Sequence, residues 1–458
     1  MQAFCRGSMD YFNLKFHKTT IKNEIYAGIV MFMAMSYILV VCPMVLSETG
    51  MNYNGVFLAT VCVSGFSTIV SAFFTKLPIA LAPGLGVTGL FLSLSTGEQA
   101  LHWAELLVAT YVSGIIICAF VHFGIFDKIM EIMDEDFRRM IMSGIGLALF
   151  LYGISTTGLL EKKTGYYIWG HVEIVPLTIC LLSILVIYLV ERRNKKSAVL
   201  LGLLVAYLLG IGVNYYNEYK IDSIGIREYL REIFSFSYNI VDIRQVMFAF
   251  PDIADMFSDG KRVQLFINAV FIFTVGHFFD AIGTNTSSFD AINSGIDSRM
   301  KDTISLKRAI SVDGVGAIVS GLMGTSSVTT YAESLVGIGS GGKTGITALT
   351  TGCLFLLSFF FSPLFTSMAA YVAAPALIYV GLKLALRYLE FDRQKKLPFL
   401  FGICIITYVG ITFNIGNAVL YGLLIYTVMK VLTEKKKPVD RWWIITIFAI
   451  IHILLNIV

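Results

Sequence analysis

Long apolar segments separated by short polar connections run through almost the whole chain. The hydrocarbon core of a bilayer is about 30 Å thick and takes roughly 20 apolar residues per helix. Because lipid offers no hydrogen-bond partners, backbone N–H and C=O groups must be paired inside the protein, which favours helices. The pattern therefore predicts an all-α polytopic membrane protein with about fourteen spans, at 24–47, 54–74, 78–96, 101–123, 138–159, 171–191, 197–214, 263–285, 307–323, 326–339, 344–363, 367–388, 397–413 and 416–432.

The long polar connector at 215–262 divides the predicted spans into two halves of seven. An odd number of spans gives the two halves opposite orientations in the membrane, as in the inverted repeats of many secondary transporters. The expected fold is therefore a 7+7 inverted repeat. The apolar stretch at 441–457 is either a fifteenth span or a helix in the membrane interface, and hydropathy alone does not distinguish them.

Composition and charge agree with a membrane location. Of 458 residues, 56% are hydrophobic and 14% charged, and the mean hydropathy of +0.75 exceeds what a water-soluble protein can hide. Lys and Arg collect in cytoplasmic loops, and a cytoplasmic N-terminus leaves only Lys162 and Lys163 in short outside loops. The net charge of +4 thus indicates topology, and no nucleic-acid partner is expected. The basic clusters predicted inside include 15–22, 138–139, 192–196, 299–308, 387–396 and 435–441.

The third segment of each half is interrupted. In the first half, KLPIALAPGLGVTGLF carries Pro78, Pro83, Gly84 and Gly86, which disfavour a continuous helix. In the second half, GLMGTSSVTTYAESLVGIGSGG combines a polar β-branched run with a glycine cluster. Matching breaks are typical of a mid-membrane binding site, where half-helix N-termini attract polar or partly negative groups. The alternative is that these glycines only allow helices to pack closely.

Two acidic residues, Asp280 and Glu333, lie inside predicted spans, where ionisable groups are costly and usually functional. A buried carboxyl group holds a proton more readily than one in water, as proton coupling requires. A carboxylate also accepts two N–H bonds from one planar heterocycle. Thr284 and His277, one helical turn after and before Asp280, are candidates to position its proton or pair with it. The alternative is that both acids are structural and bonded to hydroxyl groups.

Four aromatic residues near the breaks, Tyr37, Phe278, Phe279 and Tyr331, are candidates to stack on a flat ring. The chain contains 35 Phe and 22 Tyr, so each of the four has an equally simple alternative as a core or lipid-facing residue. The sequence contains no HExxH, no GxSxG and no P-loop, and GSGGKTG lacks the P-loop spacing. Its seven cysteines lie singly. These patterns favour a transporter over an enzyme, with no cofactor and no metal.

Several motifs together resemble one family. ALAPGLGV, FFDAIGT, LKRAISVDGVGAIVSGLMGTSSVTTYAES, GGKTGITAL, SPL and APALIYVG are similar to the AzgA-like guanine/hypoxanthine/adenine permeases of the nucleobase/ascorbate transporter superfamily. The resemblance runs from about Asn23 to Lys430. It implies proton symport of purine nucleobases across the cell membrane by an elevator mechanism, with strand and helix in each broken segment. A homodimer is a further expectation from the superfamily.

The resemblance also implies a division into domains. It predicts a core domain and a gate domain with the substrate between them. The predicted parts are the cytoplasmic N-terminus 1–23, the core domain 24–123 and 263–363, the gate domain 138–214 and 367–432, the extracytoplasmic connector 215–262, and the C-terminal segment 433–458.

Roles for single residues follow from the same resemblance. Asp280 is expected to link substrate and proton, Glu333 to hold the purine, and Thr284 to lie where uracil-type members place a histidine near the proton site. Relatives commonly carry APGMGLNAFF where this chain has APGLGVTGLF, so Thr88 replaces an asparagine. One hydroxyl replaces a two-armed amide, which leaves the preferred base open. The expected substrate site is Asp280, Glu333, Thr88, Pro83, Gly84, Phe279 and Thr330, and the expected proton site is Asp280, Thr284 and Glu333.

Other functions on this architecture remain alternatives. A uracil or xanthine carrier would share the same fold. A carrier of an anion such as sulfate would want a fixed cation at the facing half-helices, where this chain places acids. A channel would show polar stripes along several spans, and an enzyme would show a catalytic cluster at one membrane face.

Overall fold

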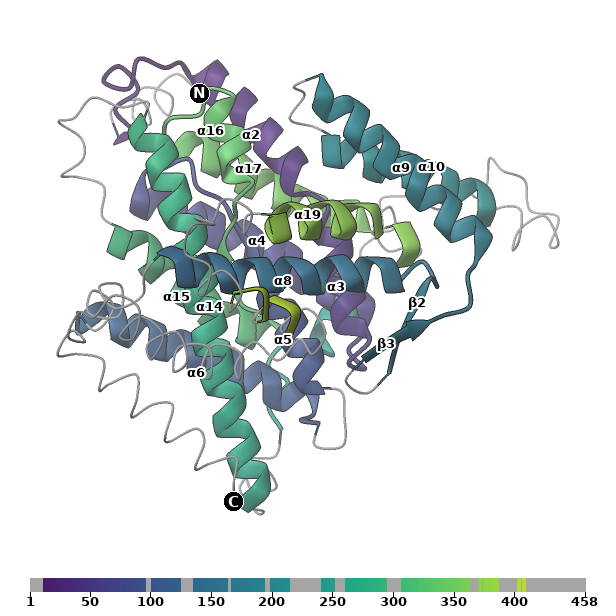
Figure 1. The fold of residues 1–458 in the computed structure, drawn as a ribbon. Coiled ribbons are helices and arrows are strands. Elements are labelled where there is room, and N and C mark those ends of the chain that lie inside the picture. The colour runs from purple at the N-terminus through teal and green to yellow at the C-terminus, as the bar shows by residue number, and fades with distance from the viewer. Residues whose placement is uncertain are drawn as a thin grey trace, which may run out of the picture.

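The computed structural model describes residues 11–95, 100–124, 135–163, 166–193, 198–214, 240–251, 260–294, 306–362, 370–372, 374–386, 402–404 and 406–408 (Figure 1). These residues are mainly helical. Five helical segments among them are long and apolar enough to cross a membrane. They are α2 (Ile21–Met35) with α3 (Ile38–Ser47), α4 (Tyr53–Thr75), α6 (Trp103–His122), α9 (Ile174–Arg192) and the apolar part of α14 (Gly260–Ser294).

The remaining elements are shorter or less apolar. The strands form two two-stranded sheets, β1 with β4 and β2 with β3. In chain order the elements are β1 (Leu81–Pro83), α5 (Leu85–Ser95), α8 (Glu135–Ser155), β2 (Leu160–Lys163), β3 (Tyr166–Trp169), α10 (Ala198–Asn214), α12 (Ile240–Arg244), α15 (Leu306–Met323), β4 (Val328–Thr330), α16 (Ser334–Gly339), α17 (Gly345–Leu357), the 3₁₀ turns η3 (Ser358–Phe360) and η4 (Ala370–Val372), and α19 (Ala374–Leu386).

Most predicted spans coincide with helices to within a few residues. The predicted span 263–285 agrees within three residues with the apolar segment Gly260–Ile282, and α14 itself continues to Ser294. Within the connector 215–262 the structure describes α12 and the first residues of α14. The predicted spans 416–432 and 441–457 lie outside the described residues, as does most of 397–413.

The described helices pack in two groups. In the first, α15 lies against α6 and α4, α17 against α4 and α2, and α14 against α5 and α6. In the second, α8 packs on α19, and α9 packs on α10 (Figure 1). Small residues allow the closest approaches, as is usual between membrane helices. A Cβ on Gly114 of α6, for example, would come within 2.7 Å of the Ile318 backbone nitrogen of α15.

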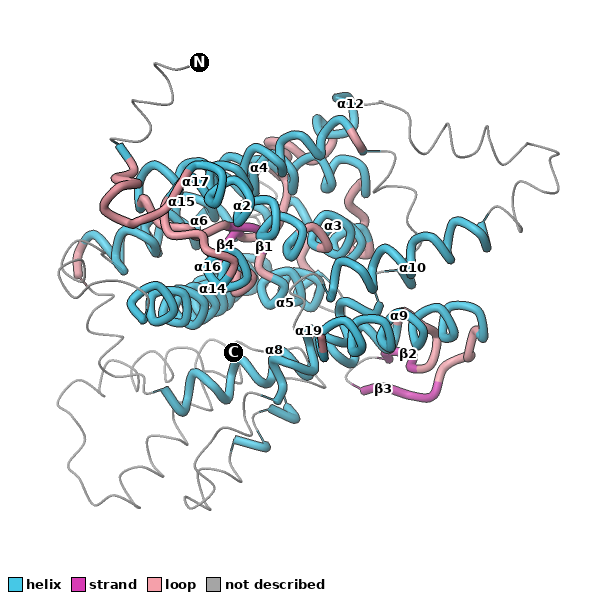
Figure 2. The backbone as a smooth tube through the Cα atoms, turned by 90° about the horizontal axis from the view of Figure 1, so that it is seen from above, coloured by secondary structure: helices cyan, strands magenta, loops and turns pink. Residues whose placement is uncertain are grey.

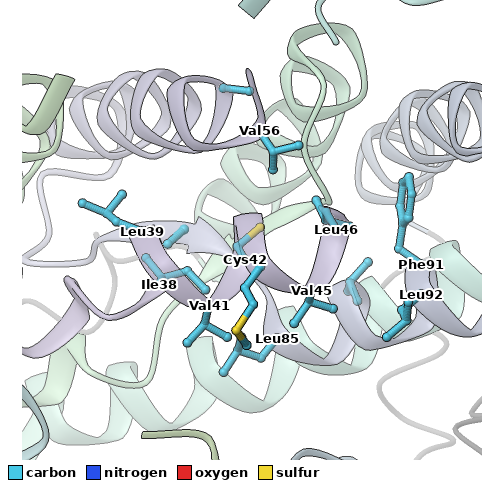
Figure 3. Packing of buried hydrophobic residues seen from close by; sticks show 14 of the residues in the cluster. Ile38, Leu39, Val41, Cys42, Val45, Leu46, Val56, Leu85, Phe91 and Leu92 are labelled. Carbon is cyan, nitrogen blue, oxygen red and sulfur yellow. The ribbon is translucent and has the colours of Figure 1, made fainter. Parts of the chain in front are cut away.

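The buried hydrophobic core of the first group surrounds α3. Side chains of α3 such as Ile38, Val41 and Val45 pack with residues of α4 and α5 (Figure 3). On α5, Phe91 stacks against Phe273 of α14, with ring centroids 5.8 Å apart. This packing holds α5, the helical part of the first broken segment, between α3 and α14.

The two interrupted segments meet as an antiparallel strand pair. Strand β1 pairs with β4 in the register Leu81↔Thr330, Ala82↔Thr329 and Pro83↔Val328. The pairing continues at both ends, where the Gly84 N–H donates to Ser327 O (3.0 Å) and the Tyr331 N–H donates to Ala80 O (3.0 Å). Figure 2 shows both strands surrounded by the first group of helices. The breaks predicted from proline, glycine and β-branched residues are thus confirmed, and their backbone groups are paired as burial requires.

The GSGGKTG loop after α16 is held by a buried acid rather than shaped as a phosphate loop. Glu24 of α2 is fully buried, and it accepts hydrogen bonds from the backbone nitrogens of Lys343 (3.1 Å) and Thr344 (3.1 Å) and from the Thr347 hydroxyl (2.6 Å). Its negative charge lies at the N-terminus of α17, where the helix dipole favours it. Glu24 therefore joins α2 to the start of α17.

We expect Gly324→Ala to destabilise the protein more than Gly341→Ala. Both glycines have a positive φ, +92° and +104°, so alanine costs each about 1–2 kcal/mol of backbone strain. At Gly324 the new Cβ would also lie 2.6 Å from Val246 O, whereas at Gly341 it meets nothing within 4 Å. Such overpacking adds about 1–3 kcal/mol. The midpoint of thermal unfolding in detergent should fall further for the first variant, and equal shifts would contradict this account.

Candidate functional site

Asp280 lies beside the strand pair that the two broken segments form. It belongs to α14, and its Oδ2 accepts a hydrogen bond from the hydroxyl of Thr329 in β4 (2.9 Å). A Cβ added to Gly84 would collide with the same Oδ2. The carboxylate therefore packs directly against the backbone that links β1 to α5, and glycine is required there by space.

Glu333 lies three residues beyond β4, at the residue that precedes α16. Its Oε1 accepts a hydrogen bond from the Tyr37 hydroxyl (2.8 Å), which comes from the junction of α2 and α3. Next to it, the Tyr331 hydroxyl donates to Pro83 O (3.1 Å). The Tyr37 and Tyr331 rings lie 6.4 Å apart at a tilt of 49°. Residues from three separate elements thus meet around this carboxylate.

The two acids share one neighbour. The phenol of Tyr331 is buried and lies close enough to both Asp280 and Glu333 to interact with their charges. The structure therefore brings together the two acids, Pro83, Gly84 and Tyr331, which lie on four different elements or their ends. Four of the expected site residues, Asp280, Glu333, Pro83 and Gly84, thus lie around Tyr331.

Thr88 lies one turn into α5 and is almost fully buried. Its hydroxyl donates to Gly84 O (2.9 Å) and shares a hydrogen bond with the Ser326 hydroxyl (2.6 Å). Ser326 in turn lies 3.9 Å from the thiol of Cys42 on α3. The Thr88 hydroxyl therefore contacts its own broken segment at Gly84 and the other broken segment at Ser326.

The helical neighbours of Asp280 make other contacts than those expected. The Thr284 hydroxyl donates to the backbone oxygen of Asp280 (2.7 Å) rather than to its carboxylate. His277 is fully buried, and its Nδ1 is hydrogen-bonded to the hydroxyl of Ser327. The side chain of Phe279 lies outside the described residues. The proton role of Thr284 stays a prediction.

Sequence reasoning missed a third buried acid, Asp313 of α15. It is fully buried, and it accepts hydrogen bonds from the Thr330 hydroxyl (2.9 Å) and from Nδ2 of Asn285 (2.6 Å). Side chains alternate along a strand, so Thr329 faces Asp280 while Thr330 faces Asp313. The rule that selects Asp280 would also have selected Asp313, since it lies inside the predicted span 307–323.

The arrangement defines what the cluster can bind. Carboxylate oxygens accept hydrogen bonds, and each can pair with N–H groups of a planar ligand. Tyr37 and Tyr331 add ring faces at the same place, suited to a flat aromatic ring. Among the described residues, no group of three or more His, Cys, Asp or Glu side chains is arranged to hold a metal ion. A small planar molecule that donates hydrogen bonds would match these groups.

Comparison with known proteins agrees with the fold and the motifs. A family model described as "Permease family" matches residues 22–418. The adenine permease AdeP of Escherichia coli is 28% identical over 94% of this chain and 92% of its own length. The guanine/hypoxanthine permease PbuG of Bacillus subtilis is 27% identical over 92% of this chain and 93% of its own length. The transmembrane domain of the cyanobacterial bicarbonate transporter BicA superposes with a TM-score of 0.59 at 16% identity, over 85% of this chain and 96% of that domain, so it shares the fold.

Proposed function

Because the chain belongs to the nucleobase/ascorbate transporter family of permeases, we propose that it imports purine nucleobases together with protons. The main support for the proposal is that Asp280 and Glu333 both lie beside the paired strands β1 and β4, with Tyr37 hydrogen-bonded to Glu333. The similar proteins include permeases for adenine and for guanine and hypoxanthine. The substrate class is therefore taken to be purine bases.

The chemistry of a purine base fits this cluster. Every purine base presents N–H donors and a flat aromatic face, and guanine places a ring N–H and an amino group side by side. A carboxylate such as Glu333 can accept both of these guanine donors, or a single donor from hypoxanthine or adenine. Tyr37 and Tyr331 offer rings for the flat face. A hydrogen-bonding site discriminates strongly against molecules that lack the matching donors, so selectivity among bases is expected to reside here.

Proton coupling is assigned to Asp280. Moving a charged carboxylate together with the bound substrate through the hydrocarbon region costs free energy, and protonation of the carboxylate removes its charge and that cost. Asp280 contacts the backbone at Gly84 and the hydroxyl of the strand residue Thr329. Protonation of Asp280 can therefore change the position of the strands that lie beside Glu333. Glu333 and Thr284 remain further candidates for the proton path.

We assign the first helix group to the core domain and the second to the gate domain. The core comprises the described elements of 24–123 and 263–363, and the gate those of 138–214 and 367–432. The N-terminus is placed in the cytoplasm of a cell-membrane protein from the distribution of Lys and Arg. Substrate is carried between the domains by an elevator-type movement of the core, and a homodimer is the expected assembly.

One contact between the two groups allows the elevator movement to be tested. The Tyr152 hydroxyl of α8 donates to Oε1 of Glu48, at the end of α3 (2.6 Å). We expect the double variant Glu48→Cys with Tyr152→Cys to lose uptake when a bifunctional methanethiosulfonate joins the two thiols, and to regain it with reductant. A spacer is needed because a disulfide requires Cα atoms within about 7 Å. Each single variant with the same reagent is the control, and full uptake by the joined protein would contradict relative movement of the groups.

Uptake assays test the proposed function itself. Cells lacking their own base permeases would express the protein and be given radiolabelled adenine, hypoxanthine, guanine, uracil or xanthine, with and without an uncoupler. Purine uptake that stops with the uncoupler is the expected result. Uptake of uracil alone would change the substrate class, uptake of xanthine alone would restrict it to that purine, and no uptake of any base by protein that reaches the membrane would refute the proposal.

A further inference from the structure

Tyr37 comes from an element that is neither of the broken segments. It lies between α2 and α3, where the Ser36 hydroxyl bonds back to Met33 O (3.1 Å) and the helix is interrupted for two residues. Its side chain is 3% exposed, and its hydroxyl donates to Oε1 of Glu333 (2.8 Å). A buried phenol thus makes a direct hydrogen bond to the carboxylate proposed to hold the base.

We propose that Tyr37 is a positioning residue that fixes the Glu333 carboxylate for substrate binding. The inference rests on the proposed function of Glu333. A glutamate side chain has several rotatable bonds, and ordering it at the moment of binding would lower affinity. The phenol orders it beforehand, since the hydrogen bond to Oε1 defines where both carboxylate oxygens point.

The surroundings of Tyr37 support a fixed donor. Its ring lies beside that of Tyr331, which is itself anchored through its hydroxyl to Pro83 O and through its N–H to Ala80 O. Tyr37 and Tyr331 therefore connect α3, β1 and the segment after β4 at one point. Phenylalanine at position 37 would keep the ring while removing its hydroxyl, which donates to Glu333 and also interacts with the Tyr331 side chain.

This role differs from direct stacking of Tyr37 on the base. If the ring alone acted, Tyr37→Phe would bind purine as tightly as the unchanged protein. If the hydroxyl acts through Glu333, Tyr37→Phe weakens binding, and it does so only while Glu333 is present. The two roles therefore give opposite results in a double-mutant cycle.

The test compares the unchanged protein, Tyr37→Phe, Glu333→Gln and the double variant, each purified and checked for a single species and for thermal stability. Binding of radiolabelled adenine and hypoxanthine gives Kd, and reconstituted uptake gives KM and maximal rate. We expect Tyr37→Phe to raise Kd and KM about tenfold, as for one lost net hydrogen bond, with the maximal rate within about twofold. The double variant should bind no more weakly than Glu333→Gln alone. Tyr207→Phe, which removes a buried hydroxyl on α10, is the matched control and should leave Kd unchanged.

Two outcomes would overturn the inference. One is an unchanged Kd in Tyr37→Phe, and the other is a further loss of binding when Tyr37→Phe is added to Glu333→Gln. If the unchanged protein bound no purine at all, the proposed function would fail instead, so the two failures are distinguishable.

Discussion

Glu333→Gln is expected to lower guanine uptake by about 100-fold or more. Glutamine has nearly the same shape, but its NH₂ group is a donor and would face the N–H donors of the base. The variant also loses the charge that strengthens these hydrogen bonds, each worth about 1.5–3 kcal/mol when one partner is ionised. Two such bonds, as guanine can make, correspond to about 3–6 kcal/mol, and each 1.4 kcal/mol is a factor of ten. Initial rates of guanine uptake at equal membrane expression measure the effect, and uptake of hypoxanthine or adenine, which offer one donor, should fall less.

The matched control for this prediction is Glu333→Asp. It retains the charge but withdraws the carboxylate from Tyr37 by one methylene, so it should retain part of the uptake that the glutamine variant loses. If the glutamine variant transported purines at the unchanged rate, Glu333 would not hold the substrate.

The second large effect is expected from Asp280→Asn. The asparagine fills the same space against Gly84 and still accepts the Thr329 hydroxyl, so folding and binding should be largely retained. It cannot take up a proton, so a pH gradient should no longer drive accumulation of the base. Proteoliposomes with an alkaline interior would then reach equal concentrations inside and outside, while exchange of labelled for unlabelled base continues.

Glu173→Gln serves as the control acid for this experiment. Glu173 precedes α9 and is exposed, far in sequence from the cluster. Gradient-driven accumulation should be unchanged in this variant. Accumulation by Asp280→Asn above the outside concentration would show that another group carries the proton.

Local sequence signals predicted the broken segments well. Proline and glycine around Pro83 disfavour a helix, and the β-branched run before Tyr331 favours extended backbone, so both breaks can be predicted without tertiary structure. Hydropathy likewise placed most helices. The pairing of β1 with β4 and its register depend on contacts between segments about 250 residues apart, and no local pattern specifies them.

The candidate site was only partly predictable for the same reason. Asp280 and Glu333 stand out as acids in apolar segments. Which hydroxyl each acid contacts depends on how helices are rotated, so the bond from Tyr37 to Glu333 and the contact of Thr330 with Asp313 required the structure. Glu24 was overlooked because an acid in the first turn of a helix usually faces solvent, whereas here it caps α17.

The most direct test of the central claim is purine transport by the purified protein alone. Proteoliposomes with an alkaline interior would be given radiolabelled adenine, hypoxanthine and guanine, with and without a protonophore, alongside liposomes carrying Glu333→Gln. We expect accumulation of at least one purine that requires the gradient, stops with the protonophore and is absent in the variant. Equal uptake of every purine by the protein-containing and the protein-free liposomes would contradict it.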